Sequence, residues 1–467
     1  MKRLRLLGGI VFVVTLLWVA GIIFSTPKAE AAPATFTVTN TNSSGLGSLV
    51  QAIQDANSNN NPTEKDTINF NIPGAGPHYI VPPYGGGPTY VTEPIALDGT
   101  TQTGSECGGE LKIVYDTSSS RNSPLELALS ASDSLIKGIV FYDSDNSGLL
   151  VSGNYNKVEC NYFGLTPDGQ DKLDNVGVAL LVRGSENHIG GPNMSQRNYL
   201  VSNYFLIGAN NTLENNVFGY SVDLAANLSL NTIISPAAGG VGAIENYVIK
   251  NNVFQGYSAF NRADPIEGIL FIGNKICTNP TGSNNICSSR SGMTIYLGTL
   301  AATEAVQFGG NNVNDSNTIA PSIDGVFGAQ EAVDNVKIIN NKINVASNGT
   351  DTFPYPVQYA LIHLNFTGLA SEISHNTIAG SSRSAIVVGG GTGHVNIHDN
   401  KIFNNTESAV YSIPNIASIY KNEMYGNGNR SVVRSYTNSQ TLNDSPDNDG
   451  VVNYPVVREL EIVDADS

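Results

Sequence analysis

The sequence is poor in charged residues, cysteine and tryptophan. Only 14% of its 467 residues are charged, there are four cysteines, and the single tryptophan, Trp18, lies in the N-terminal leader. So few lysines and glutamates disfavour a helical protein, and the rest of the chain has no tryptophan on which a sugar could stack. The 48 glycines and the many Asn-Asn pairs favour short strands joined by Gly- and Asn-rich turns.

Positive charge is also scarce. The 24 lysines and arginines stand against 40 aspartates and glutamates, which gives a formal net charge of −16, and several of the basic residues fall in the leader. An acidic surface repels nucleic acid at long range, so nucleic-acid binding is excluded as a function. A polyanionic glycan could bind only through a local basic patch or a bridging cation.

Only the N-terminus is apolar for long enough to cross a membrane. Residues 1–34 are typical of an export signal, because a basic start (Lys2–Arg5) precedes an uncharged run from Leu6 to Phe24 and then small residues. The run of 19 residues can also span a bilayer. A cleaved signal peptide and an uncleaved anchor are therefore both open, and either would place the remainder outside the cell or on its surface.

The four cysteines suit an oxidising destination. Cys277 and Cys287 bracket a turn-rich segment, and we expect them to form a disulfide that closes a small loop. Cys107 and Cys160 then pair or stay free, since four cysteines allow three pairings. Cysteines and histidines are not clustered as zinc ligands are, so the sequence predicts no metal site of this kind.

One short pattern recurs along the chain: an aliphatic residue, two variable residues, Asn, one variable residue, then Ile, Phe or Met. Clear copies contain Asn252, Asn274, Asn341, Asn376, Asn400 and Asn422, and looser copies contain Asn161 and Asn216. Spacings of 22 and 24 residues, with strand-like alternation, are typical of one β-helix coil. The 43 residues from Asn274 to Asn317 fit either one coil with an insertion or two irregular coils.

The sequence therefore predicts an all-β fold, a right-handed parallel β-helix (a solenoid) with a short N-terminal capping helix. Strands of adjacent coils lie about 4.8 Å apart. Equivalent asparagines are then in register, and each side-chain amide can donate to one neighbouring coil and accept from the other. We interpret the recurrent asparagine as a structural ladder and not as a ligand.

The expected organisation has four parts. They are the leader at 1–34, an N-terminal cap at 35–94, the β-helix at 95–440 and a C-terminal closing segment at 441–467. In the cap, Ser48 and Gln51 are spaced as a capping box that opens a helix reaching about Asn57. Leu49, Ile53 and Ala56 share one face of this helix and can cover the first coil.

Several segments resemble a family of bacterial surface and secreted β-helix proteins. Residues 36–57 are similar to the capping segment of its CSLREA-type and polymorphic outer-membrane-protein-like groups, and residues 93–102 to the strand and turn that follow. Further sequence motifs of the family match residues 161–169, 187–191 and 443–455. The resemblance implies the pectin-lyase-like fold. The chain departs from the family in lacking a cysteine before Ser48 and in having Val50 where arginine is usual.

The sequence contains none of the complete catalytic motifs of the enzymes that have this fold. Hydrolysis of acidic polysaccharide needs paired carboxylates across a groove. The Asp-Asp phrase of galacturonase-like hydrolases is missing, and Gly393–Val395 matches their Gly-His-Gly only in part. Elimination needs a basic residue beside a calcium-binding Asp cluster at coil spacing, and that pattern is also missing.

One column of polar residues is the nearest candidate for a site. His375, Asp399 and Lys421 each precede a repeat asparagine, so they should stack on adjacent coils, and Arg383 lies between these coils. His375 and Asp399 are candidates for acid–base chemistry, while Lys421 and Arg383 are candidates for substrate binding. The simpler interpretation, which we favour, is an exposed ladder of mixed charge.

Two acidic turns, at residues 143–148 and 444–450, carry alternating oxygen ligands that end in glycine. They resemble half of an EF-hand loop, so Ca²⁺ binding is an alternative to ordinary Asp-Asn-Gly turns, although we expect no cofactor. The favoured hypothesis is an exported, non-catalytic β-helix for adhesion, envelope structure or glycan binding, with a cell-surface polysaccharide or surface protein as partner. The alternative is a polysaccharide lyase or glycoside hydrolase with an unrecognised site.

Overall fold

The structure is a computed structural model of the chain. It describes residues 32–59, 64–87, 89–118, 124–142, 148–173, 178–201, 203–206, 208–228, 244–256, 258–260, 266–287, 294–297, 304–329, 332–354, 357–413, 416–428 and 431–434. Residues 1–31 of the expected leader, the closing segment and nearly all of the two acidic turns lie outside the described residues. Within the described residues, no helix has the length and apolarity to cross a bilayer.

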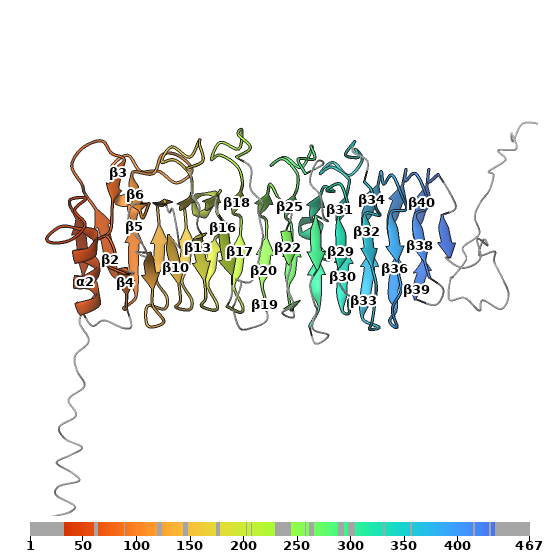
Figure 1. Ribbon diagram of the computed structural model, residues 1–467, viewed down its shortest axis with the longest axis horizontal. Helices are drawn as coiled ribbons and strands as arrows, with labels where there is room; N and C mark the ends of the chain where they lie inside the picture. The colour runs from red at the N-terminus through yellow and green to blue at the C-terminus, as the bar shows by residue number, and fades with distance from the viewer. Residues whose placement is uncertain are drawn as a thin grey trace, which may run out of the picture.

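The described strands form long parallel sheets that run side by side along an extended molecule (Figure 1). The longest, sheet A, has 14 strands. They are β1 (Thr35–Val38), β2 (Asp66–Phe70), β5 (Ile95–Asp98), β8 (Leu135–Lys137), β11 (Lys157–Glu159), β14 (His188–Gly190), β17 (Thr212–Glu214), β20 (Val248–Lys250), β24 (Leu270–Ile272), β27 (Val306–Phe308), β30 (Val336–Ile339), β33 (Ser371–Ser374), β36 (Val395–His398) and β39 (Ala417–Tyr420).

Sheet B follows sheet A in each coil and has 13 strands. They are β3 (His78–Ile80), β6 (Ile113–Asp116), β9 (Ile139–Tyr142), β12 (Tyr162–Phe163), β15 (Tyr199–Leu200), β18 (Val217–Phe218), β21 (Val253–Phe254), β25 (Lys275–Ile276), β28 (Thr318–Ile319), β31 (Lys342–Ile343), β34 (Thr377–Ala379), β37 (Lys401–Phe403) and β40 (Glu423–Tyr425).

The third face is divided between sheets C and D. Sheet C contains β4 (Thr89–Val91), β7 (Leu125–Leu127), β10 (Leu149–Val151), β13 (Val178–Val182) and β16 (Asn203–Leu206). Sheet D contains β22 (Ser258–Phe260), β26 (Ile295–Leu297), β29 (Phe327–Ala329), β32 (Ile362–Leu364), β35 (Ile386–Val388), β38 (Val410–Ser412) and β41 (Val432–Arg434). A small sheet pairs β19 (Ile244–Glu245) with β23 (Ile266–Glu267), and three 3-10 turns cover Gly99–Thr101, Met194–Gln196 and Val313–Asp315.

This topology confirms the predicted fold, a right-handed parallel β-helix, which has the hand that parallel crossovers adopt. Sheet A continues without a break from β1 to β39, so strand pairing of the solenoid begins within the expected N-terminal cap. The long gap between Asn274 and Asn317 holds a single coil with an insertion, because β24 pairs directly with β27.

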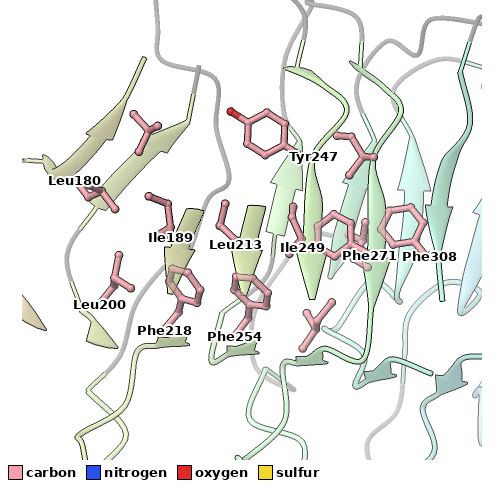
Figure 2. Packing of buried hydrophobic residues seen from close by; sticks show 14 of the residues in the cluster. Leu180, Ile189, Leu200, Leu213, Phe218, Tyr247, Ile249, Phe254, Phe271 and Phe308 are labelled. Carbon is pink, nitrogen blue, oxygen red and sulfur yellow. The ribbon is translucent and has the colours of Figure 1, made fainter. Parts of the chain in front are cut away.

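Inward side chains stack on the same position of the next coil and form one continuous core. Ile373 on β33 aligns with Ile397 on β36, and Ile397 aligns with Ile419 on β39. Figure 2 shows the middle of this core, where buried phenylalanines lie in line. The rings of Phe218 and Phe254 stack at 4.6 Å with an interplanar angle of 10°. In-register stacking of like side chains therefore stabilises each coil on its neighbours.

The predicted asparagine ladder is confirmed. Its members are buried or half-buried, and each donates through Nδ2 to Oδ1 of the next over 2.8–3.2 Å. The bonded series is Asn161, Asn198, Asn216, Asn252, Asn274, Asn317, Asn341, Asn376, Asn400 and Asn422. The ladder therefore supplies hydrogen-bond partners to buried polar groups at this turn.

Hairpins cover the outer face of sheet B, above its strands in Figure 1. Four are closed by antiparallel bridges, at Leu165–Lys172, Tyr220–Asn227, Thr278–Asn285 and Val345–Thr352. A second apolar layer lies beneath them, separate from the main core. Cys277 is bonded to Cys287, the pair that the sequence favours, and Cys107 is bonded to Cys160, a pairing that the sequence left open.

The N-terminal end is covered by helix α2 (Leu49–Asn59), close to the predicted span. Leu49, Ala52, Ile53 and Ala56 are buried, as the predicted helix face requires. The capping box is only half formed. Gln51 N donates to Ser48 Oγ over 3.2 Å, but the Gln51 side chain donates to Asp55 Oδ1 over 2.8 Å instead of returning to the cap.

Candidate functional site

The predicted column is assembled at the turn that leads from sheet A to sheet B. His375, Asp399 and Lys421 lie on three successive coils, directly after β33, β36 and β39. All three have left-handed backbones, with φ of 56°, 53° and 53°. On other coils the equivalent residues, Asn251 and Asn340, directly precede a ladder asparagine and have the same left-handed backbone. The position therefore favours residues that tolerate positive φ, as Asn, Asp and His do.

His398, on the outer face of β36, is the centre of a network that spans these coils. Its Nδ1 is 2.8 Å from Asp399 Oδ2, and its Nε2 is 3.2 Å from Glu372 Oε1 on β33. One face of its ring stacks on Tyr420 with centroids 4.8 Å apart, and the His375 ring meets it edge to face at 5.9 Å. Only 16% of the His398 side chain is exposed.

The electrostatics keep Asp399 ionised. The hydrogen bond with His398 holds the pKa of the Asp399 carboxyl below its usual range, and the nearby His375 and Lys421 act in the same direction. An ionised carboxylate can orient a cation or accept a proton, but it cannot serve as a general acid. Ser374 Oγ donates to Glu372 Oε1, so that carboxylate is also engaged within the network.

The polar groups of this network bond to one another, whereas a catalytic site leaves a group available to the substrate. Both nitrogens of His398 face carboxylates, so the ring has no free lone pair with which to take a proton from a substrate. Acid–base chemistry would require one of these contacts to open. The arrangement is suited to holding adjacent coils together on the outer face of sheet A.

Arg383 does not join this column. It precedes β35, in the turn that leads from sheet B to sheet D, and its Nη1 lies 3.5 Å from Glu407 Oε1. With 61% of its side chain exposed, it forms a surface ion pair. The described residues contain no group of three or more His, Cys, Asp and Glu arranged to hold a metal ion.

Sequence reasoning missed a shallow groove on the outer face of sheet C. It has a volume of about 550 Å³ and is lined by Glu126, Ala128, Leu129, Ser130, Ser152 and Arg183. Ser152 Oγ donates to Glu126 Oε1 over 3.1 Å, which fixes the carboxylate across two coils. Tyr90 aligns with Glu126 on the neighbouring strand and is 51% exposed. The only repeat copy in this part of the sequence is the looser one at Asn161, and the groove residues lie outside it, so no spacing signal brings them together.

Arg183 is the unpaired cation of this groove. Its side chain is exposed, and within the described part of the chain its guanidinium makes no ion pair or hydrogen bond. Leu129 is 75% exposed beside it. The groove thus combines an apolar wall, a fixed carboxylate, hydroxyls and a guanidinium that is free to bind an anion.

No protein-family model matches the chain, and no curated protein matches its sequence. Solved structures of similar shape include three proteins of low sequence identity. The A-module of mannuronan C-5 epimerase AlgE4 from Azotobacter vinelandii is 11% identical, with 85% of this chain and 96% of that one covered and a TM-score of 0.36. A mutant tailspike protein of E. coli bacteriophage HK620 is 11% identical, with 88% and 81% covered and a TM-score of 0.38.

The third is an alginate lyase from a Paenibacillus species, 12% identical, with 86% of this chain and 99% of that one covered and a TM-score of 0.28. Scores of this size give no residue-by-residue correspondence, so the groove and the column are interpreted from this chain's own geometry. Its parallel sheets, in-register core and asparagine ladder make the chain a right-handed parallel β-helix of the pectin-lyase-like type.

Proposed function

We propose that the chain is an exported β-helix that binds polysaccharide without cleaving it, through the groove on sheet C. The observation that carries the proposal is the unpaired Arg183 in a groove that also contains Glu126 and Ser152, with the exposed Tyr90 on the strand next to Glu126. Hydroxyls and carboxylates of a glycan are the partners that such a set of groups selects. The leader's composition supports export to the cell surface or medium.

The spacing of the coils along the groove also matches the repeat of a polysaccharide chain. The coils of sheet C repeat every ~4.8 Å along the axis, which is close to the length of one pyranose in a polysaccharide. From β4 to β13 there are three such steps, or about 14 Å. A glycan segment lying along the axis could therefore place one sugar on Tyr90 and an anionic sugar against Arg183.

The test uses residues 32–467 and a panel of soluble polysaccharides, scored for binding and for release of reducing ends or unsaturated products. We expect binding of an acidic glycan without product, weakened about tenfold in Arg183→Gln, as loss of one charge-assisted contact predicts. The matched control is Arg383→Gln, which removes an exposed arginine from another turn. Binding that is unchanged in both Arg183→Gln and Glu126→Gln would show that the groove is not the site.

A second candidate function is polysaccharide cleavage at the His398 network. The observation that favours it is the pair of carboxylates, Glu372 and Asp399, placed on either side of one imidazole. Product release that disappears in His375→Ala or Asp399→Ala would establish this function and overturn the non-catalytic proposal. Calcium is added in a parallel series, because the two acidic turns are sequence candidates for binding it.

A further inference from the structure

The groove on sheet C holds one negative and one positive charge that do not neutralise each other. Glu126 lies on β7 and Arg183 directly follows β13, and the coil of β10 lies between them. Their strands are two spacings apart, or about 9.6 Å. Within the described residues, neither side chain forms an ion pair. A ligand in the groove therefore meets a carboxylate toward one end and a guanidinium toward the other.

Ser152 holds the carboxylate apart from the guanidinium. Ser152 N donates to Leu127 O and Arg183 N donates to Val151 O, both over 2.8 Å, so Ser152 and Arg183 occupy equivalent positions on adjacent coils. The Ser152 hydroxyl donates to Glu126 Oε1 over 3.1 Å, while Glu126 Oε2 makes no hydrogen bond within the described residues. The carboxylate is thus held one coil, or ~4.8 Å, from the coil that carries Arg183, which is close to the length of one pyranose.

This spacing disfavours a glycan that carries a carboxylate on every sugar. When one carboxylate binds Arg183, a neighbouring sugar brings its own carboxylate within reach of Glu126. Like charges at such a distance repel, and a groove reduces the screening of this repulsion by solvent and salt. Among the described residues that line the groove, no second cation offsets it.

The end of the groove at β7 suits an N-acetylamino group instead. Glu126 Oε2 can accept a hydrogen bond from an amide N–H, and a hydrogen bond to an ionised acceptor is stronger than a neutral one. Leu129, from the same coil, is 75% exposed and offers an apolar contact for the acetyl methyl group. An acceptor near an apolar side chain therefore matches the two parts of an acetamido group.

We propose that the groove selects a polysaccharide in which a uronic acid alternates with an N-acetylamino sugar. The uronate carboxylate binds the guanidinium of Arg183, and the acetamido group of the adjacent sugar donates to Glu126 and contacts Leu129. Two charge-assisted hydrogen bonds then form, and neither charge of the groove is left without a partner. The inference rests on the proposed binding of glycan in this groove, and it names the class of glycan that the groove takes.

The experiment measures the affinity of residues 32–467 for tetrasaccharides by isothermal titration calorimetry. Hyaluronan and unsulfated chondroitin fragments supply a uronate and an N-acetylamino sugar in alternation. Tetragalacturonate supplies a carboxylate on every sugar, and chitotetraose supplies an acetamido group on every sugar. We expect at least one alternating probe to bind about tenfold more tightly than either uniform probe, because only the alternating chain satisfies both ends of the groove.

Glu126→Gln is the central variant, because it removes the charge but keeps the size of the side chain and an acceptor for the Ser152 hydroxyl. We expect it to weaken the alternating probe about threefold and to strengthen tetragalacturonate about threefold, since one attraction and one repulsion are lost. Arg183→Gln should weaken every anionic probe about tenfold. Glu423→Gln is the matched control, because it removes an exposed carboxylate from β40 on sheet B, and it should change no affinity.

Leu129→Ser tests the apolar contact of the acetamido group. It should weaken the alternating probes and chitotetraose about threefold, because it removes apolar surface that the acetyl methyl would cover. The affinity for tetragalacturonate should stay unchanged, since that probe has no acetyl group. Circular dichroism melting confirms that each variant is folded.

Two results would overturn the inference and leave the proposed function standing. The first is a uniform probe that binds at least as tightly as both alternating probes and is weakened by Arg183→Gln or Glu126→Gln. The second is a Glu126→Gln variant in which the ratio of the affinities for alternating probe and tetragalacturonate is unchanged, while Arg183→Gln lowers both. If no probe binds, or if binding responds to neither substitution, the proposed function fails together with the inference.

Discussion

At the scale of single residues, one ladder asparagine satisfies several buried polar groups at once. Asn274 Nδ2 donates to Ile249 O over 2.7 Å and to Asn317 Oδ1 over 3.1 Å. Its Oδ1 accepts from the backbone N–H of Asn252 over 2.9 Å and from Asn252 Nδ2 over 3.1 Å. The residue is fully buried, so these four contacts have no water to replace them.

Replacing Asn274 with alanine should therefore be costly. It removes the acceptor of the buried Asn252 N–H, one of the two acceptors of Asn252 Nδ2 and the side-chain donor to Ile249 O, and we expect a loss of about 3 kcal/mol in the free energy of unfolding. Asn422→Ala is the matched control, because Asn422 is a half-buried ladder member near the C-terminal end of the described coils and water can reach its site. Urea denaturation measures both variants. Equal losses would contradict the view that burial sets the cost.

Asp399 should make the stability of the fold depend on pH in a direction that follows from its lowered pKa. Its pKa is lowered in the folded chain, chiefly by the hydrogen bond with His398, so it stabilises the fold above the unfolded pKa, and this contribution is lost as pH falls through the folded pKa. Asp399→Asn tolerates the same left-handed backbone. We expect it to be less stable than the parent at pH 7, and the difference to vanish as the pH falls through the lowered pKa of Asp399. A constant difference across this range would refute the role.

Single residues were predicted well only where the repeat places them. The spacing of 22 and 24 residues put His375, Asp399 and Lys421 in one column, and the structure agrees. It could not show that Asp399 and Glu372 share the imidazole of His398, because that depends on rotamers and on pairing between strands. Arg183 could not be placed for a different reason, since it lies outside the repeat pattern and its part of the chain holds only the looser copy at Asn161.

At the scale of elements, the hairpins form an outer layer over sheet B, and two disulfides attach this layer to the solenoid. Cys107 and Cys160 are 53 residues apart, and Cys277 and Cys287 are 10 apart. Both bonds attach covering segments to the apolar layer beneath them. The sequence could predict the short link from its turn-rich loop, whereas the long one joins segments whose proximity appears only in the fold.

The two bonds should differ in their effect on stability. Loop-closure entropy predicts that removing the 53-residue link, in a Cys107→Ala and Cys160→Ala double variant, costs about 4 kcal/mol. Removing the 10-residue link, in Cys277→Ala with Cys287→Ala, should cost about 2.7 kcal/mol. Denaturation of both double variants under oxidising conditions tests the order. A larger loss for the short link would mean that local packing, and not loop entropy, dominates.

Helix α2 shows how local patterns succeed and fail at this scale. Its buried face follows from helical spacing and was predicted from Leu49, Ile53 and Ala56. The capping box was predicted from Ser48 and Gln51, but only the serine half forms. Asp55, one turn further along the helix, competes for the Gln51 side chain, and a two-residue motif cannot register such a competitor.

At the scale of the whole molecule, the solenoid is a one-dimensional stack in which each coil contacts its neighbours. Its stability is then close to a sum of coil and interface contributions. The period, the core and the ladder were all visible in the sequence because the same constraint is repeated at every coil. Loop insertions and grooves were not, since each occurs once and obeys no period.

A deletion in phase with the repeat tests this whole-molecule picture. Removing residues 401–422 joins Asn400 to Glu423, so Glu423–Tyr425 takes the place of Lys401–Phe403 and every remaining coil keeps its register. We expect this variant to fold, because its new neighbours match in size and facing. Circular dichroism and resistance to limited proteolysis measure this. Removing residues 401–412, which is out of phase, is the control and should expose the core and increase cleavage.

The same in-phase deletion tests whether distant coils are independent. It removes one coil near the C-terminal end of the described residues and leaves Glu126, Ser152 and Arg183, at least eight coils away, untouched. A folded variant should therefore keep the affinity for an acidic glycan that the groove on sheet C provides. If the distant groove lost affinity as well, the coils would be coupled over tens of ångströms, and a stack of independent units would be the wrong description of this solenoid.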